Sequence, residues 1–316
     1  MPESRRSHLV AVIAMAAIAA VWGGGFPATK YCLQGGLSVG ALLTLRFAIG
    51  AAGLGLMMLL LRVPIRRRDA LDGLWLGLVL ATLFWLQTDG LRFTTTSKSG
   101  FITGLYVIFT PVVALLAGDR LRPSHGLAAL VALAGLALLV REPGAAWGGW
   151  NRGDSETLLA AVLCGFHIVM TAHFSRRSSG WVLAFMQVAV TGAISLAITL
   201  ALPAPHGFQG TGTALARGGT WVSLGFMGLL ATTLAFYVQS TMQARLGATE
   251  SAILFSLEPV WTALIAISGV VPGVLEHLGP TQLAGGLLIL AATFVAELGP
   301  RLLKRLQRPE PEEAIG

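Results

Sequence analysis

The chain has 316 residues, of which 54% are hydrophobic and 12% are charged, and its formal net charge is +7. Soluble globular domains usually contain about 25% charged residues, so this composition argues against a soluble fold. The basic residues form short groups between apolar segments, which is typical of membrane topology signals and argues against a nucleic-acid-binding face.

Apolar segments of membrane-spanning length follow one another along the whole chain. A transmembrane helix needs about 20 apolar residues, whereas barrel strands would be about 10 residues long with strict alternation, which this sequence lacks. We therefore predict an all-α polytopic membrane protein. The ten predicted transmembrane helices cover residues 9–31, 38–61, 71–92, 97–117, 124–141, 157–174, 180–202, 219–241, 248–271 and 279–299.

The distribution of Lys and Arg among the connecting loops predicts the orientation in the membrane. Cytoplasmic loops carry an excess of these residues near the span ends. With both termini in the cytoplasm, 15 basic residues lie inside and 6 lie outside, and Arg46 lies within a span. The inner set is Arg5, Arg6, Arg62, Arg66, Arg67, Arg68, Arg120, Arg122, Arg176, Arg177, Arg245, Arg301, Lys304, Arg305 and Arg308. We expect a multi-pass protein of the plasma (inner) membrane.

The first two spans contain a tryptophan beside a glycine run and an intramembrane arginine. Trp22 precedes three glycines and Pro27 follows them, a pattern that allows a helix to bend or another helix to approach closely. Trp22 is therefore a candidate cavity residue and Pro27 a candidate helix break. Arg46 can bind a substrate carboxylate or phosphate, pair with Asp89, or extend toward the membrane surface.

Spans three and four add polar and aromatic candidates. Gln87 can bind substrate or simply hold helices together, because a hydrogen bond between helices is worth only about 0.6 to 2 kcal/mol in a membrane. Trp85 is expected to form a wall of the same cavity. In span four, Tyr106 is placed near the cavity and Pro111 is a candidate helix break.

Spans six to eight carry His167, Gln187, Tyr237 and Gln239. A single histidine on an apolar helix is more often a hydrogen-bonded packing residue than a proton relay, although its ordinary pKa makes a relay chemically feasible. Tyr237 and Gln239 are expected near the cavity, as are Trp85 and Gln87.

Glu258 in span nine is the main candidate for substrate binding or coupling. An intramembrane charge costs about 2.5 to 3.5 kcal/mol on insertion scales and therefore suggests a function. Pro259 follows it and removes a backbone donor, which predicts a helix break. A carboxylate there can bind a proton, a cation or a substrate amine. The alternative is a residue that only locks helix packing.

Constant numerical offsets relate the two halves of the chain. Gln187 lies 141 residues after Arg46, and Gln239 lies 152 residues after Gln87, as Tyr237 does after Trp85. Pro111 and Pro259 differ by 148, which suggests an extra turn in span four and leaves either Tyr106 or Thr110 as the counterpart of Glu258. Two five-span units must enter the membrane in opposite directions, as in inverted-repeat transporters.

At these residues the chain resembles the drug/metabolite transporter superfamily, specifically its EamA-type ten-helix members, over nearly its whole length. The marks are Trp22-Gly23, Arg46, the run from Phe101 to Tyr106 with Pro111, and Ser256-Leu257-Glu258-Pro259 with Ala263. The family often has a Gly-Glu pair after span nine, whereas Gly273 and Glu276 are separated here. The resemblance implies two EamA-type repeats, at residues 1–148 and 149–300, followed by a cytoplasmic basic and acidic tail at 301–316.

The predicted function is secondary active transport by alternating access. The resemblance implies a small polar metabolite, either an amino acid or related compound or a drug-like cation, that is exported or exchanged, and Glu258 is compatible with proton coupling. A lipid-linked substrate flippase or a channel on the same fold remains the alternative. A GxxxxGK[ST] loop, HExxH and GxSxG are missing, so no ATP-driven pump or enzyme is predicted. The expected partners are a small-molecule substrate and the lipid bilayer, with no nucleic acid, cofactor or metal, and Gly/Ala faces are compatible with a homodimer.

Overall fold

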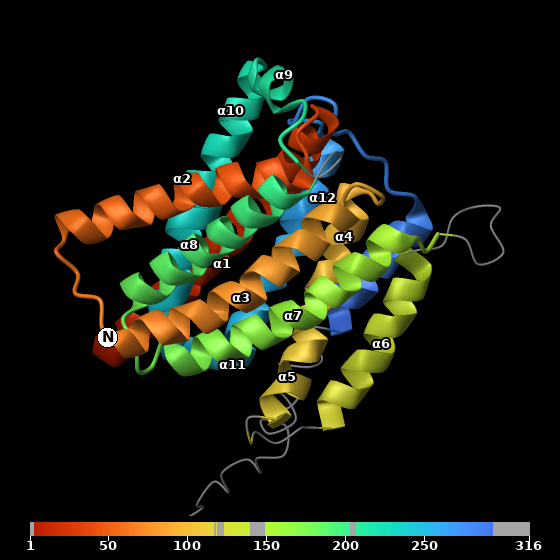
Figure 1. Cartoon of the computed structure of the whole chain (residues 1–316). Coiled ribbons are helices and arrows are strands. Elements are labelled where there is room, and N and C mark those ends of the chain that lie inside the picture. The colour runs from red at the N-terminus through yellow and green to blue at the C-terminus, as the bar shows by residue number, and fades with distance from the viewer. Residues whose placement is uncertain (1–2, 117, 119–122, 140–148, 203–206, 293–316) are drawn as a thin grey trace, which may run out of the picture.

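The computed structural model describes residues 3–116, 118, 123–139, 149–202 and 207–292, and this part of the chain is helical without strands (Figure 1). The helices are α1 (Glu3–Gln34), α2 (Val39–Leu60), α3 (Arg67–Gly90), α4 (Thr96–Gly104), α5 (Tyr106–Leu116), α6 (Pro123–Leu139), α7 (Arg152–Phe174), α8 (Gly180–Ala201), α9 (Thr211–Leu215), α10 (Gly218–Gly225), the π-helix η1 (Phe226–Leu234), α11 (Ala235–Phe255) and α12 (Glu258–Ser268). A last apolar helix covers Pro280–Ala292.

The predicted all-α membrane class is confirmed. Seven helical segments among the described residues are long and apolar enough to cross a membrane. One of them, Gly218–Ser268, contains the predicted span eight and most of span nine, and α6 and Pro280–Ala292 lie at the predicted spans five and ten. The count of ten spans remains a prediction. Parts of the predicted elements lie outside the described residues, namely 117, 140–141, 293–299, the tail 301–316, and the loop residues Arg120, Arg122, Arg141, Arg301, Lys304, Arg305 and Arg308.

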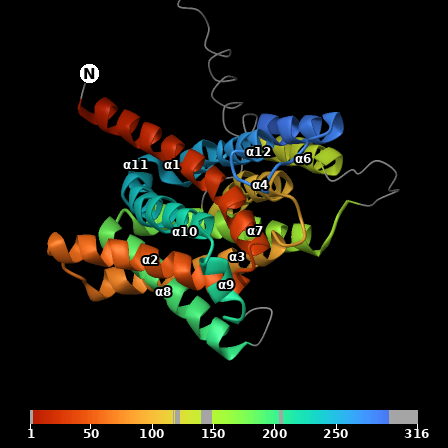
Figure 2. The same ribbon diagram turned by 90° about the horizontal axis from the view of Figure 1, so that it is seen from above.

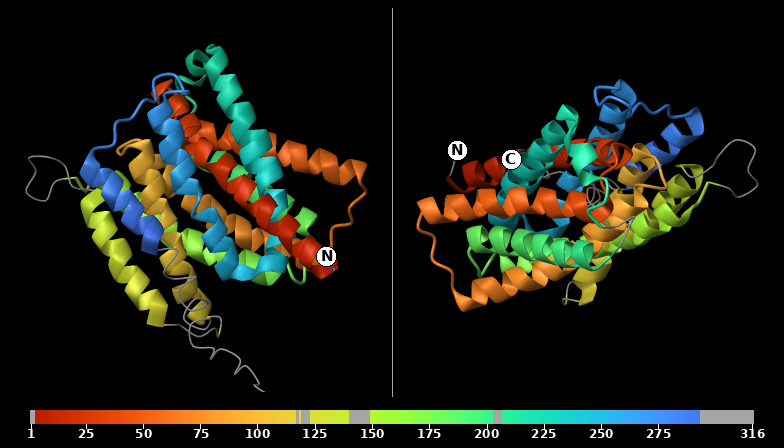
Figure 3. Two further views of the ribbon diagram at one scale, coloured as in Figure 1. Left: turned by 180° about the vertical axis from the view of Figure 1, so that it is seen from behind. Right: turned by 45° about the horizontal axis from the view of Figure 1, so that its top comes forward.

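Helices from the two halves of the chain pack against each other. Helix α2 contacts α8, α3 contacts both α7 and α8, and α1 contacts α11 and α12. Figure 2 shows α2 and α8 on one side of the molecule, with α12 and α6 on the other. The view from behind in Figure 3 shows α1 and α12 side by side. This pairing places residues of both halves around a shared interior.

Helix α1 passes through Pro27 without ending, so the expected helix break at this proline is wrong. Proline frees the carbonyl four residues earlier from its helical hydrogen bond, which is that of Gly23. The Thr262 hydroxyl on α12 donates a hydrogen bond to this oxygen at 3.2 Å. A Cβ at Gly23 would lie 2.6 Å from Trp261 Cβ, so the glycine run serves close helix packing.

Two helix breaks occupy equivalent positions in the two halves. Leu105 separates α4 from α5, and Leu257, with Ser256, separates α11 from α12. Subtracting 105 from 257 gives 152, the offset that also relates Gln87 to Gln239. Each new helix then begins with a candidate residue, Tyr106 in α5 and Glu258 in α12.

A repeated hydrogen bond supports this equivalence. Thr110 donates its hydroxyl to the Tyr106 carbonyl at 2.7 Å. The Thr262 hydroxyl lies 3.0 Å from the Glu258 carbonyl oxygen and shares its single proton between this oxygen and that of Gly23. The pairs again differ by 152 residues. The counterpart of Glu258 is therefore Tyr106 and not Thr110.

The prolines occupy different points of these equivalent helices. Pro259 lies in the first turn of α12, directly after the break, where a missing N–H costs nothing because the first turn has no helical partner for it. Pro111 lies inside α5, well after the break at Leu105. The expectation of a break at Pro111 is therefore wrong, as is the extra turn that the offset of 148 suggested.

A second discontinuity separates the predicted spans eight and nine. Gly247 in α11 has φ 82° and ψ 176°, a backbone conformation that residues with a Cβ avoid. In the same segment, η1 widens the helix into a π-helical turn, a feature that is frequent at functional sites.

Polar contacts join the ends of the helices. Glu276, in the connection after α12, accepts hydrogen bonds from the backbone N–H groups of Thr96 and Ser97 at the start of α4, where a carboxylate also complements the helix dipole. Asp154 on α7 forms an ion pair with Lys98 at 2.7 Å. At the opposite end of α3, Arg177 forms an ion pair with Asp72 at 2.6 Å.

Candidate functional site

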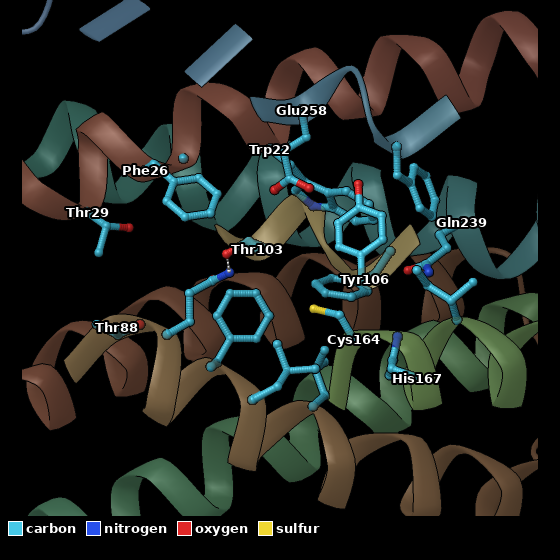
Figure 4. Close-up of a pocket in the computed structure, with 18 of the residues that line it drawn as sticks. Trp22, Phe26, Thr29, Thr88, Thr103, Tyr106, Cys164, His167, Gln239 and Glu258 are labelled. Atoms are coloured by element: carbon cyan, nitrogen blue, oxygen red, sulfur yellow. Dashed lines mark hydrogen bonds between the residues drawn. The ribbon is translucent and has the colours of Figure 1, made fainter. Parts of the chain in front are cut away.

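A cavity lies in the interior between the two helix breaks (Figure 4). Its walls come from α1, α2, α3, α4, α5, α7, α11 and α12. Seven of the predicted site residues line it, namely Trp22, Arg46, Gln87, Tyr106, His167, Gln239 and Glu258. The cavity therefore collects residues that are up to 236 positions apart in the sequence, from Trp22 to Glu258.

Arg46 is 4% exposed and supplies the positive charge of the cavity. Its Nε donates to the Thr232 hydroxyl in η1 at 3.0 Å, and its guanidinium carbon lies 4.6 Å from the centre of the Phe84 ring. Its two terminal nitrogens donate no hydrogen bond to another described residue. Asp89 is not its partner, because that carboxylate binds Arg92 and Arg152, each at 2.8 Å.

Glu258 supplies the negative charge. It is 9% exposed, and its carboxylate lies beside the Tyr106 hydroxyl (Figure 4). No described cation lies within ion-pair distance of it, Arg46 included. Although the Tyr106 hydroxyl is buried, it makes no hydrogen bond of good geometry within the described part of the chain. The cavity thus contains an arginine and a carboxyl group that form no direct ion pair with each other.

Trp22 forms the centre of an aromatic wall. Its ring centroid lies 5.7 Å from that of Phe236 and 5.0 Å from that of Phe255. Its indole N–H donates to the Ala231 carbonyl of η1 at 2.9 Å. The π-helix therefore positions both Trp22, through Ala231, and Arg46, through Thr232.

The two equivalent glutamines have different partners. Gln87 Nε2 donates to the Thr103 hydroxyl at 3.2 Å (Figure 4). Gln239 Nε2 donates to Gln243 Oε1 at 3.2 Å. Both side chains line the cavity, so both are placed to contact a bound molecule.

His167 takes part in a buried hydrogen-bond network at one end of the cavity. Its Nε2 lies 2.8 Å from Gln187 Oε1, and Gln187 Nε2 donates to the Ser240 hydroxyl at 3.0 Å. These contacts join α7, α8 and α11. His167 therefore lines the cavity and belongs to a hydrogen-bond network that joins three helices.

Trp85 and Tyr237 do not line this cavity. The Trp85 indole N–H donates to Ser195 Oγ at 3.3 Å, and Tyr237 stacks on Trp181 with ring centroids 3.9 Å apart. Residues three apart on a helix share a face, whereas adjacent residues do not. Because Gln87 and Gln239 face the cavity, their neighbours three positions earlier, and not two, share that face.

Those neighbours are Phe84 and Phe236, which line the cavity and which the sequence interpretation missed. They differ by 152 residues, as the glutamines do. Their position three residues before each glutamine is the sequence signal that identifies them. Cys164 and Phe255 also line the cavity, and nothing in the sequence pattern singled them out.

Comparison with known proteins matches the chain to a protein family, to a curated relative and to a solved structure. A model of the EamA-like transporter family matches residues 9–141 and 151–297. The chain is 30% identical over 293 residues to an uncharacterized transporter of Archaeoglobus fulgidus, covering 92% of this chain and 87% of that protein. A crystal structure with 21% sequence identity matches with a TM-score of 0.67 and covers 92% of this chain and 99% of its own. At that identity, the last match supports the fold alone.

Proposed function

Since the chain belongs to the EamA-like transporter family and is a multi-pass membrane transporter, we propose that it is a secondary active transporter that exports or exchanges a small polar metabolite by alternating access. The observation that carries the proposal is the interior cavity with Arg46 and Glu258 in its wall and no ion pair between them. Buried charges are costly in a membrane and are usually retained for a substrate or an ion.

The proposed substrate class rests on these two groups. The terminal N–H groups of Arg46 make no hydrogen bond to another described residue and are suited to a carboxylate, and Glu258 can bind an ammonium group. Aromatic rings from Trp22, Phe84 and Phe236 supply the apolar surface between them. A small zwitterion, such as an amino acid or a related compound, satisfies both charges at once, whereas a drug-like cation satisfies only Glu258.

The asymmetry between equivalent positions supports alternating access. In the first half, Phe26, Arg46, Thr88 and Leu91 all line the cavity. Their counterparts at offsets of 141 or 152 are His167, Gln187, Ser240 and Gln243. Among these only His167 lines the cavity, and the others are fully or almost fully buried in helix contacts. Inverted repeats transport by exchanging two such arrangements between their halves, so the second set is expected to open when the first closes.

Proton coupling is the proposed role of Glu258. A carboxylate in a membrane interior can alternate between a neutral protonated form and a charged form that binds a cation, and such residues mark proton pathways in transporters. Tyr106 lies beside it, so its hydroxyl can donate to the charged form. A substrate ammonium and a proton would then compete for the same group.

Counterflow tests the proposed function. Purified protein in proteoliposomes is loaded with unlabelled amino acids, organic cations or organic acids, and uptake of the labelled compound is measured at several pH values. Saturable uptake that is stimulated by the same compound on the other side supports a transporter of that class. Flux that rises linearly with concentration and is unaffected by the unlabelled compound on the opposite side of the membrane supports a channel. Translocation of labelled lipid without flux of any soluble compound supports a flippase.

A further inference from the structure

A chain of hydrogen bonds behind the cavity fixes the direction of the Gln239 amide. Gln243 Nε2 donates to the backbone carbonyl of Ile168 at 2.7 Å, and Gln239 Nε2 donates to Gln243 Oε1 at 3.2 Å. A backbone carbonyl can only accept. The NH2 group of Gln243 must therefore point toward Ile168 and its oxygen toward Gln239. Gln239 must in turn donate its own NH2 group to that oxygen.

This order leaves the carbonyl oxygen of Gln239 without a donor. The side chain is 2% exposed and lines the cavity, and Oε1 has no hydrogen-bond partner among the described residues. Rotating the amide of Gln239, or that of Gln243, would place two acceptors or two donors against each other in this series of hydrogen bonds. A buried acceptor without a donor costs free energy, so this oxygen is held ready for a donor that arrives in the cavity.

Trp22 packs between the helix segments that lead to Gln239 and to Glu258. On one side the indole packs against Phe236, one turn before Gln239, and on the other against Phe255, three residues before Glu258 across the break between α11 and α12. Figure 4 shows Gln239, Tyr106 and Glu258 around the same space. This part of the cavity therefore offers a carboxylate, an amide oxygen and aromatic rings. Together these groups suit a cation that carries N–H donors.

The geometry points to Gln239 as the residue that recognises a primary ammonium group on the substrate by accepting a hydrogen bond from it. Gln243 is the positioning residue, which fixes the orientation of the Gln239 amide. Glu258 supplies the charge, and the Gln239 oxygen accepts one of the three N–H bonds. A trimethylated ammonium has the same charge but no N–H donor, so it leaves this oxygen unsatisfied. The inference deepens the proposed function and rests on it.

The first half of the chain lacks this device, which provides a matched control. Gln87 is the counterpart of Gln239, but Leu91 stands at the position of Gln243. The Gln87 amide donates to the Thr103 hydroxyl, which can donate as well as accept, so its direction is not imposed. Gln243→Leu copies the first-half arrangement into the second half.

The test compares two compounds of the same charge, a small amino acid and its N,N,N-trimethyl derivative, in which methyl groups replace the three N–H hydrogens. Binding is measured in detergent as ligand-induced thermal stabilisation, and counterflow is measured in proteoliposomes. The wild type should prefer the primary amine by roughly tenfold, the ratio expected for one hydrogen bond to a charged group. Gln239→Met should lose this preference, Gln243→Leu should reduce it, and Gln87→Met should retain it.

Two outcomes overturn the inference, and they can be told apart. If Gln239→Met keeps the wild-type preference, Gln239 does not read the N–H groups, although the proposed function stands. If the wild type binds and transports neither compound, the proposed amino acid class fails and the inference fails with it. Size-exclusion profiles and melting temperatures without ligand show which variants are folded. Gln243→Leu provides a second route to the same result if Gln239→Met does not insert.

Discussion

Arg46 and Glu258 line the same cavity from α2 and α12 without forming an ion pair. In a low-dielectric interior, two opposite charges attract strongly when they touch. Their separation instead leaves each available to a ligand.

Glu258→Gln should abolish substrate flux driven by a pH gradient and leave membrane insertion intact. The amide imitates the protonated carboxyl and cannot release a proton. In proteoliposomes, flux of the transported compound is compared with and without an imposed pH gradient. Wild-type protein should respond to the gradient, and the variant should not. A variant whose flux still follows the gradient would assign proton coupling to another group.

Arg46→Gln should raise the KM for substrates that carry a carboxylate by roughly 10- to 100-fold, the range for losing a hydrogen bond to a charged group. The KM for the matching amine without a carboxylate should change much less. Arg152→Gln is the control, because Arg152 is a highly exposed arginine whose ion pairs lie outside the cavity. Equal loss for both compounds would mean that Arg46 serves the fold and not recognition.

Gly23→Ala should destabilise the protein by about 1 to 3 kcal/mol, the usual cost of overpacking. Its Cβ would lie 2.6 Å from Trp261 Cβ and 2.9 Å from the Glu258 carbonyl oxygen. Gly25→Ala is the matched control, since a Cβ there meets nothing within 4 Å. Melting temperatures in detergent should separate the two variants. Equal melting temperatures would contradict the close approach of α1 and α12.

Asp154→Asn should cost about 3 to 5 kcal/mol, the range for removing one partner of a buried ion pair. Asp154 is 0% exposed, binds Lys98 and accepts hydrogen bonds from the Thr94 hydroxyl and the Asn151 N–H. The double variant with Lys98→Met should recover part of the loss, because no buried charge then stands alone. Thermal unfolding of the single and double variants measures this coupling. Additive losses would argue against the pair.

Membrane orientation can be measured by labelling single cysteines in a background that lacks Cys32 and Cys164. Arg66→Cys and Gly218→Cys lie at exposed positions that the distribution of basic residues places inside and outside, respectively. A membrane-impermeant maleimide should label position 218 in intact cells and position 66 only after permeabilisation. The reverse pattern would invert the predicted topology.

Much of the candidate site was predictable from the sequence. Charged and amide side chains in apolar spans are rare enough that Arg46, Gln87, Gln239 and Glu258 could be identified without coordinates, and all four line the cavity. The aromatic residues were harder to assign, because apolar helices carry them on every face. The sequence therefore did not distinguish Trp85 and Tyr237, which lie outside the cavity, from Phe84 and Phe236, which line it, and only the packing of the helices shows the difference.

The sequence by itself determined the helical membrane class, because runs of apolar residues of this length have few alternatives in lipid, and it determined the offsets that relate the two halves. The tertiary structure decided where the helices break. Helix α1 continues through Pro27, because Thr262 on α12 donates a hydrogen bond to the carbonyl of Gly23 that the proline leaves without a helical partner, whereas a break occurs at Leu105 without a proline. It also decided that Arg46 turns to Thr232 and away from Asp89, and that Gln239 presents its oxygen to the cavity. Such choices depend on hydrogen bonds between residues far apart in the chain, which no local pattern specifies.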